Sequence, residues 1–365
     1  MSTILVLTNN IDGLHCFRKE VMKALVDEGF EVIISYPDQS EKAEYFSSIG
    51  CQLVFTPFNR RGMNPVADMK LMLSYRRLIK KFKPSVVLTY TIKPNIYGGM
   101  ACRLCGVPYM ANVTGLGDSL ENGGMLAKLA KTLYHIGLKK AYRVFFQNKS
   151  NMATGKKMGL ISGPITLLPG SGVSLEHHVY QSYPQEDTIK FLFIGRLLRD
   201  KGVGELFEAA KRIKSTCPNT EFHILGPCEG NFKDQLDELE KAGIIIYHGP
   251  SNDVRPFIGN VHCTIMPSYH EGMSNVNLES AANGRPVITT DVPGCQETVD
   301  DGVTGFLCQA KSTDSLTEAL EKFLSLSPEE KEKMGQAGRQ KVEREFSRDI
   351  VVKEYVENCK KITNK

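Results

Sequence analysis

Short apolar runs recur along the chain, and amphipathic stretches of helical length separate them. In the first half we predict strands at 4–8, 31–36, 52–58, 85–91, 108–115 and 143–148, with helices before Gly29 and at 71–83. A strand that is apolar at every position, not at alternate ones, is typical of a parallel sheet covered by helices on both faces. This half is therefore predicted to be an α/β, doubly wound, Rossmann-like domain.

A second series of the same kind follows the polar stretch 182–188. Its predicted strands lie at 189–195, 221–226, 244–249, 263–268 and 286–291, and its helices near 203–216 and 231–242. At 365 residues the chain has the length of two domains. We expect domains at 1–183 and 184–346. A last helix, about 347–365 and after a helix at 328–345, is expected to cross back onto the first domain.

Several classes of protein are disfavoured by composition. No apolar run reaches 18 residues, so no membrane-spanning helix is expected, and the start MSTILVLTNN does not resemble a signal peptide. A net charge of +4 without a binding motif gives no reason to expect nucleic acid. Of ten cysteines only Cys102 and Cys105 are closely spaced, within a helix-like stretch, so we expect no metal site, no cofactor and a reducing, cytoplasmic location.

Two cations follow the predicted strand 189–195. Arg196 and Lys201 lie in GRLLRDKG, where Arg offers a bidentate contact and Lys a point charge to a diphosphate. Taken alone, the segment is more typical of solvated charges before a helix.

The segment SYHEGMSNVNLESA, residues 268–281, carries two carboxylates. Gly272 permits close backbone approach, and Ser274 or Asn275 is suited to begin a helix whose free N–H groups favour a phosphate. Glu271 then precedes the phosphate site, and Glu279 lies in the second helical turn. This spacing suits a nucleotide sugar, with a hexose at one end and ribose hydroxyls at the other. The alternative is a surface loop acid followed by a solvated helix residue.

Together these motifs resemble those of the retaining glycosyltransferases of family 4, which have the GT-B fold of two Rossmann-like domains facing across a cleft. Glu271 and Glu279, with seven residues between them, match the hallmark of that family, and GRLLRDKG and GRPVITTDVPGCQETVDDGVTGF (284–306) match further motifs. LPGSGVSLE (168–176) resembles its interdomain segment, with Ser174 where Asp is common. TYTIKPNIYGG (89–99) and NVTGLGDS (112–119) resemble the subgroup that builds capsule, O-antigen or lipid-linked oligosaccharides.

The resemblance implies a role for each matching residue. Glu271 is expected to orient the donor hexose as the catalytic residue, either as positioner or as nucleophile, and Glu279 to hold the ribose. The donor diphosphate is expected to contact Arg196, Lys201, Gly13 and the backbone of Gly272, Met273, Ser274 and Asn275. Divalent ions in glycosyltransferases are usually held by Asp-x-Asp, and no such triplet occurs here, so metal independence is expected.

Acceptor recognition is expected in the first domain, at Thr91, Lys93 and Thr114. A Lys at this point can pair with an acceptor phosphate, although a solvated loop lysine is the equal alternative. The stretch 125–143 reads as a basic amphipathic helix, typical either of a membrane-surface helix or of an ordinary crossover helix.

We therefore expect transfer of a hexose or N-acetylhexosamine from a UDP-sugar to a polyprenyl-diphosphate-linked glycan, in polysaccharide biosynthesis. The enzyme is expected on the inner face of the cytoplasmic membrane, as a peripheral protein. Alternatives are transfer to a soluble acceptor, a sugar-nucleotide epimerase of the same fold, or a non-catalytic nucleotide-sugar binding protein. A dehydrogenase is disfavoured because no strand–GxGxxG–helix fingerprint occurs.

Overall fold

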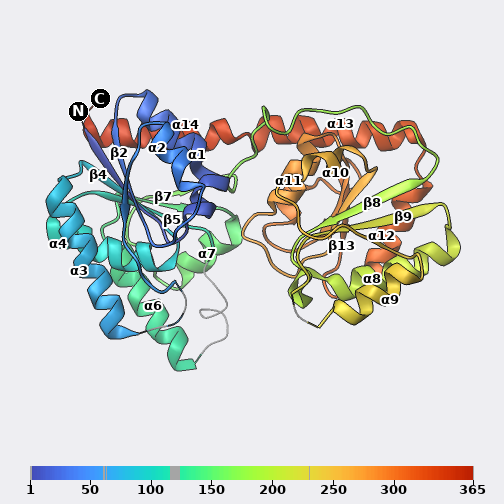
Figure 1. Ribbon diagram of the computed structural model, residues 1–365, viewed down its shortest axis with the longest axis horizontal. Coiled ribbons are helices and arrows are strands. Elements are labelled where there is room, and N and C mark those ends of the chain that lie inside the picture. The colour runs from blue at the N-terminus through green and yellow to red at the C-terminus, as the bar shows by residue number, and fades with distance from the viewer. Residues whose placement is uncertain (1, 61, 63, 116–123, 230, 365) are drawn as a thin grey trace. The chain divides into compact units, whose positions relative to one another are not determined.

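The structure is a computed structural model that describes residues 2–60, 62, 64–115, 124–229 and 231–364 (Figure 1). The chain forms two compact units, Met1–Ser171 with Asp349–Lys365, and Gly172–Arg348. Each unit is built around one parallel sheet.

The sheet of the first unit has seven strands in the order β3-β2-β1-β4-β5-β6-β7, and every neighbouring pair is parallel. The strand bounds are β1 (Thr3–Leu7), β2 (Glu31–Tyr36), β3 (Gln52–Phe55), β4 (Val86–Tyr90), β5 (Tyr109–Val113), β6 (Arg143–Phe146) and β7 (Ile165–Leu167). The order reverses between β1 and β4. In open α/β sheets, ligands bind beyond the carboxyl ends of strands at such a point.

Helices cover both faces of this sheet. Residues of α1, α2 and α14 share one buried apolar cluster with β1 and β4, and residues of α3, α4 and α6 share another on the opposite face. The bounds are α1 (Ile11–Asp27), α2 (Ala43–Ser48), α3 (Pro65–Phe82), the π-helical turn η1 (Pro94–Gly98), α4 (Gly99–Cys105), α6 (Gly124–Leu138), α7 (Lys149–Lys157) and α14 (Arg348–Thr363).

The sheet of the second unit has six parallel strands in the order β10-β9-β8-β11-β12-β13. They are β8 (Ile189–Ile194), β9 (Thr220–Leu225), β10 (Ile246–Tyr247), β11 (Cys263–Met266), β12 (Val287–Thr290) and β13 (Gly305–Cys308). The α-helices are α8 (Val203–Thr216), α9 (Lys233–Lys241), α10 (Arg255–Gly259), α11 (Asn275–Ala282), α12 (Thr313–Ser325) and α13 (Pro328–Glu345), and the 3₁₀ turns are η2 (Arg199–Lys201) and η3 (Gln296–Thr298). Residues of α8, α9 and α12 contribute to the largest buried cluster, while α11 and α13 share a separate one.

The predicted fold class, two Rossmann-like domains with parallel sheets, is confirmed. The boundary differs: the units divide between Ser171 and Gly172, before the expected 183/184. Tyr183 explains the difference. Its hydroxyl donates to the His262 carbonyl at 3.0 Å and its ring packs against Arg285, so the polar stretch 182–188 is attached to the second unit.

Two local predictions were wrong in extent, and two strands were missed. The predicted strand 244–249 contributes only Ile246–Tyr247, and the helix expected across 125–143 ends at Leu138, so that Arg143 begins β6. Strands β7 and β13 were not expected. Along the described residues, no helix combines the length and the apolar character needed to cross a bilayer.

Candidate functional site

Two loops at the carboxyl edge of the second sheet bring a cation and a carboxylate together. The loop after β8 carries Lys201 and the loop after its neighbour β11 carries Glu271. The Lys201 Nζ lies 2.5 Å from the Glu271 Oε1, and the two side chains are 19% and 18% exposed. Both groups are thus partly shielded from water but still reachable by a ligand.

The two loops are joined backbone to backbone. Gly202 has φ +69°, and a Cβ there would lie 2.0 Å from the Pro267 carbonyl oxygen, so only glycine fits this approach. The Tyr269 amide donates to the Asp200 carbonyl at 2.8 Å. The distance between Lys201 and Glu271 is therefore set by rigid backbone contacts.

Ser268 fixes the carboxylate further. It is fully buried, and its Oγ donates to the Glu271 Oε1 at 2.9 Å. Its own carbonyl accepts from the Thr290 hydroxyl on β12. The oxygen that contacts Lys201 is thus also held from inside the unit.

Helix α11 begins where it was expected. Ser274 is the N-cap, and its side chain accepts from the Asn277 amide. The Ser274 amide is taken by the Gly294 carbonyl at 2.7 Å, and a Cβ at Gly294 would lie 2.3 Å from the Glu271 carbonyl oxygen. The loop after β12 therefore supports this turn, and Glu297 is structural, since it accepts the Gly294 amide at 2.7 Å.

Met273 and Asn275, which were both expected at the donor phosphates, offer different groups to a ligand. The side chain of Met273 is 7% exposed and packs with Val173, Leu278 and Phe346, which leaves only its backbone for a ligand. The Oδ1 of Asn275 is buried and has no hydrogen-bond partner among the described residues, so it retains an unused acceptor beside the helix start.

Glu279 lies in the second turn of α11 and is partly buried. Burial raises the pKa of this carboxyl to about 7, although the charge of Arg348 acts in the opposite direction. Near neutrality the group can accept a hydrogen bond when ionised and donate one when protonated.

Arg196 is not joined to this cluster. It is 52% exposed, and its Nη1 lies 3.4 Å from the Glu229 Oε2, whereas Lys201 pairs with Glu271. The two cations expected to act on one diphosphate thus have different acid partners.

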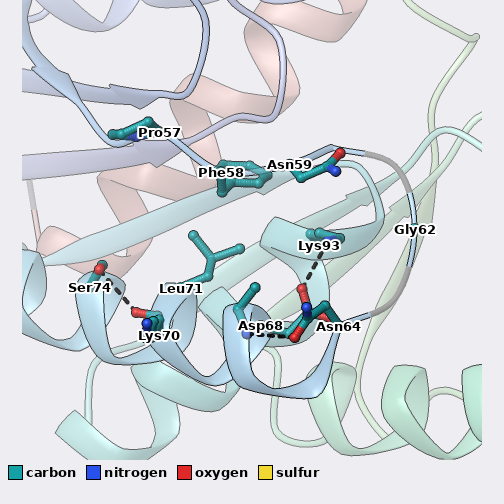
Figure 2. A pocket seen from close by; sticks show the side chains of 11 residues that line it. Pro57, Phe58, Asn59, Gly62, Asn64, Asp68, Lys70, Leu71, Ser74 and Lys93 are labelled. Atoms are coloured by element: carbon teal, nitrogen blue, oxygen red, sulfur yellow. Dashed lines mark hydrogen bonds and ion pairs between the residues drawn. The ribbon is translucent and has the colours of Figure 1, made fainter.

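In the first unit, Lys93 is paired rather than solvated. Its Nζ lies 2.8 Å from the Asp68 Oδ1, and the side chains are 13% and 7% exposed (Figure 2). Tyr97 donates to the other oxygen of Asp68 at 3.0 Å. Burial, followed by this hydrogen bond, raises the pKa of Tyr97, which therefore stays a donor.

The other first-unit candidates are dispersed. Thr91 adopts φ +72°, and its Oγ1 is buried without a hydrogen-bond partner among the described residues. Thr114 is exposed just after β5. Gly13 was expected at the donor diphosphate. It lies inside helix α1, which begins at Ile11, and its amide donates to the side chain of the N-cap Asn10 at 3.1 Å.

Sequence reasoning missed Ser268, Asp68 and Tyr97. Asp68 lies in the first turn of α3, which begins at Pro65, ahead of the expected start at 71. The available signal for Asp68 was its place as an acid between two apolar residues, Ala67 and Met69. Among the described residues, no group of three or more His, Cys, Asp or Glu side chains is arranged to hold a metal ion.

Comparison with known proteins shows the family of the chain. The glycosyl transferases group 1 family model matches residues 178–341, and the glycosyl transferase 4-like model matches 4–148. The capsular polysaccharide biosynthesis glycosyltransferase CapM of Staphylococcus aureus is 32% identical over 318 residues, covering 81% of each chain.

Two further relatives are enzymes of lipid-linked glycans by name. The N,N'-diacetylbacillosaminyl-diphospho-undecaprenol alpha-1,3-N-acetylgalactosaminyltransferase of Campylobacter jejuni is 26% identical over 329 residues, 86% of each chain. The UDP-Gal:alpha-D-GlcNAc-diphosphoundecaprenol alpha-1,3-galactosyltransferase of Escherichia coli is 25% identical over 328 residues, 85% of this chain and 84% of that one.

A solved glycosyltransferase of Rickettsia africae has the same fold, with a TM-score of 0.82 at 19% identity over 99% of this chain and 98% of that one. Family models match most of both units, and the CapM similarity extends over four fifths of the chain. The chain therefore belongs to the group 1 glycosyltransferases, the family 4 enzymes of the GT-B fold.

Proposed function

We propose that this glycosyltransferase moves a hexose or N-acetylhexosamine from a UDP-sugar to a glycan linked to a polyprenyl diphosphate, with retention of anomeric configuration. The observation that carries the proposal is the Lys201–Glu271 pair, held by Ser268 beside the start of α11. It combines a phosphate-binding cation with a sugar-binding carboxylate at the carboxyl edge of a Rossmann-like sheet.

On the donor side, Lys201 and Arg196 neutralise the diphosphate, and the backbone of Met273 and Asn275 adds N–H donors. The Ser274 amide is already bonded to the Gly294 carbonyl, so it does not contribute. Glu271 orients the hexose, and Glu279 accepts hydrogen bonds from the ribose hydroxyls. Two cations make a divalent ion unnecessary, which fits the lack of an Asp-x-Asp triplet in the sequence. The name of the Escherichia coli relative, which specifies UDP-Gal, supports a UDP-sugar.

Retention is supported by the names of two relatives. Both form alpha-1,3 linkages, and an α-configured UDP-sugar that gives an α-linked product keeps its configuration. The same names specify diphosphoundecaprenol acceptors, which supports a lipid-linked acceptor. We propose that Thr91, Lys93 and Thr114 of the first unit hold it.

Such an acceptor requires access to the inner face of the cytoplasmic membrane. In α6 and the turn after it, Lys128, Lys131, Lys139 and Lys140 are exposed, and Leu129 is 47% exposed. We propose that this surface contacts anionic lipid. Co-sedimentation with anionic liposomes that falls as salt rises supports the contact, and no binding at low salt contradicts it.

A donor screen tests the reaction itself. The purified protein is incubated with labelled UDP-sugars and membrane extract, and the expected result is label in the organic-soluble lipid fraction. Each UDP-sugar is also incubated alone. Conversion of a UDP-sugar into its epimer in the absence of acceptor identifies an epimerase and contradicts the proposal.

A further inference from the structure

Two histidines of the second unit face each other at the edge of its sheet. His223 lies on β9, and its register partner on the edge strand β10 is Ile246. His248 follows Ile246 by two residues, which places its side chain on the same face of the sheet as His223. The His223 Nδ1 lies 2.9 Å from the His248 Nε2, and the two rings are parallel to within 8°. Two imidazole nitrogens thus point at one another from neighbouring segments.

A carboxylate fixes the state of the inner ring. The Glu221 Oε2 lies 3.2 Å from the His223 Nε2, and because a carboxylate can only accept, a neutral His223 carries its proton on Nε2. Its Nδ1 then presents a lone pair to His248. A carboxylate behind a histidine is the arrangement that orients imidazole ligands in metal sites and raises their basicity.

Both rings are neutral near neutrality. Burial lowers the pKa of His223, although the hydrogen bond to Glu221 acts in the opposite direction, and burial lowers the pKa of His248 as well. Two charged rings could not share this contact, since each would present an N–H to the other. A metal ligand must offer a lone pair, and His248 does so once its proton moves from Nε2 to Nδ1.

The pair can be reached from solvent. The side chain of His223 is 16% exposed, and His248 is exposed. Phe257 on α10 packs edge-on against the His248 ring with the ring centroids 5.1 Å apart, which restricts the rotation of this side chain. The two nitrogens are therefore accessible to a hydrated ion and partly held in place.

The spacing of the two nitrogens is close to that of a metal site. Zinc–nitrogen bonds of about 2.0–2.1 Å at a tetrahedral angle separate two ligand nitrogens by about 3.3 Å. The contact of 2.9 Å must therefore open by about 0.4 Å to admit the ion. Among the described residues, no third protein ligand is arranged with the pair, so water would complete the coordination.

The charges around the pair favour a cation. Glu221 and Glu240 act on the two rings as negative charges. Lys190 acts in the opposite direction, but its Nζ is paired with Glu186. A positive ion between the rings is thus attracted by two acids and opposed by one cation that is already neutralised.

The edge strand that the pair joins to the sheet is short. β10 pairs with β9 only through Ile246 and Tyr247, and Ile246 is 39% exposed. One further backbone hydrogen bond follows, from the His248 amide to the Ile224 carbonyl at 2.9 Å. An edge strand with so few backbone hydrogen bonds is drawn from the less stable parts of a fold, and a link between its side chains and the next strand would hold it.

We infer that His223 and His248 bind a transition-metal ion such as Zn²⁺, which links β10 to β9. The ion bonds the His223 Nδ1 and the His248 Nε2, and Glu221 orients His223. Imidazole ligands favour zinc, copper and nickel over magnesium and calcium. The ligands come from β9 and the end of β10, not from the loops after β8 and β11, so the inference is independent of the proposed function and sugar transfer does not require the ion.

Calorimetric titration with Zn²⁺ tests the site, in a Cys16→Ser background that removes an exposed cysteine. Glu221→Gln should weaken binding about tenfold, because the ring loses its orienting carboxylate. His248→Gln should weaken it at least as much as this, about tenfold or more, since a ligand itself is lost. His248 is exposed, so this variant should fold normally. His177 is an exposed histidine outside the pair, and His177→Gln is the matched control that should leave binding unchanged.

Two further readouts report on the ligands and on the strand. The electron paramagnetic resonance spectrum of one equivalent of Cu²⁺ should show two imidazole nitrogens in the wild type and fewer in His248→Gln. Saturating Zn²⁺ should raise the Tm of the wild type but not of His248→Gln, because a ligand that binds only the folded state stabilises it. It should also slow hydrogen exchange in the peptide 244–249 of the wild type.

The inference is overturned if Zn²⁺ binds the wild type no more tightly than His248→Gln, or if Mg²⁺ binds the pair as tightly as Zn²⁺. A single copper-bound nitrogen in the wild type contradicts ligation by both rings, and undiminished binding in Glu221→Gln contradicts the orienting carboxylate. A rise in Tm without slower exchange at 244–249 contradicts the link between the strands. Failure of sugar transfer would contradict the proposed function alone, because none of these measurements depends on it.

Discussion

Glu271 and Glu279 belong to one motif but lie in different surroundings. Glu271 is held by Lys201 and Ser268 at the loop, whereas Glu279 is on the helix near Arg348. We propose that Glu271 acts on the sugar as its bond breaks. We propose that Glu279 binds ribose, whose contacts are alike in ground and transition states.

Their kinetic effects should therefore differ. Glu271→Ala should lower kcat about 100-fold with little change in KM, and Glu279→Ala should raise the donor KM about tenfold with kcat nearly unchanged. Steady-state kinetics with varied UDP-sugar measures both parameters. Changes of the same kind in both variants would contradict the assigned roles.

We propose that Ser268 is a positioning residue that acts through Glu271. Ser268→Ala removes the hydrogen bond to the carboxylate and should lower kcat about tenfold, with unchanged donor KM. Ser280 is the matched control, since it is also fully buried in this unit but its Oγ has no hydrogen-bond partner among the described residues. Ser280→Ala should leave kcat unchanged, and equal losses in both variants would show a merely structural effect.

Glu279 also makes stability depend on pH. Its pKa is raised from 4.5 to about 7, so the folded protein holds this proton more tightly than the unfolded chain does. The carboxyl therefore lowers stability as pH rises from 4.5 to 7, and the loss is complete above pH 7. Glu279→Gln should be as stable as wild type at pH 4.5 but about 1–3 kcal/mol more stable at pH 8.

Urea unfolding at the two pH values measures this difference. The variant should at the same time bind the UDP-sugar more weakly, because the neutral amide is a poorer acceptor for ribose hydroxyls. A stability gain that is the same at both pH values would contradict a titrating Glu279.

At the scale of elements, the proposed donor site depends on two loops that approach backbone to backbone. Gly202→Ala places a Cβ on the Pro267 carbonyl at positive φ, and should cost about 2 kcal/mol or more and displace Lys201 from Glu271. Gly204, two residues on in the first turn of α8, has nothing within 4 Å of its added Cβ. Gly204→Ala should be neutral or stabilising by about 0.5–1 kcal/mol.

Thermal unfolding and nucleotide binding measure both variants. A Gly202→Ala protein with wild-type stability and affinity would show that the loops do not need this approach.

The elements that sequence predicted well are the long periodic ones. The helices at 203–216 and 328–345 and the strand at 31–36 have the expected bounds, since each combines a clear apolar pattern with end signals. The short strands β7 and β13 were missed because three or four residues carry too little pattern. β13 also begins at Gly305, whose added Cβ would lie 1.9 Å from the Val287 carbonyl oxygen, so it depends on a tertiary contact.

The candidate site was predictable only as far as motifs extend. Glu271 and Lys201 were predicted from the resemblance of their motifs to a family, and the α11 cap from local sequence. The partners Ser268 and Asp68 arise from pairings that only the folded sheet creates. The acceptor residues Thr91, Lys93 and Thr114 stay predictions. The structure adds that Lys93 is buried against Asp68, which no local pattern shows.

At the scale of the whole molecule, the chain's last helix completes the first unit. Tyr355 on α14 stacks with Tyr90 at the end of β4, and Arg18 on α1 lies over both rings at 5.9 and 5.8 Å. The first unit thus includes residues that follow the second unit in the sequence. We propose that the first unit binds the acceptor and the second unit the donor.

The most direct test of the central claim is transfer to a defined acceptor. The purified enzyme is given the UDP-sugar selected by the donor screen and a synthetic polyprenyl-diphosphate-linked monosaccharide, in EDTA, and the product is analysed by mass spectrometry and NMR. The account predicts one added sugar in α-linkage on the lipid-linked acceptor, formed about 100-fold more slowly by Glu271→Ala. A β-linked product, a strict need for a divalent ion, or transfer only to soluble sugars would contradict it.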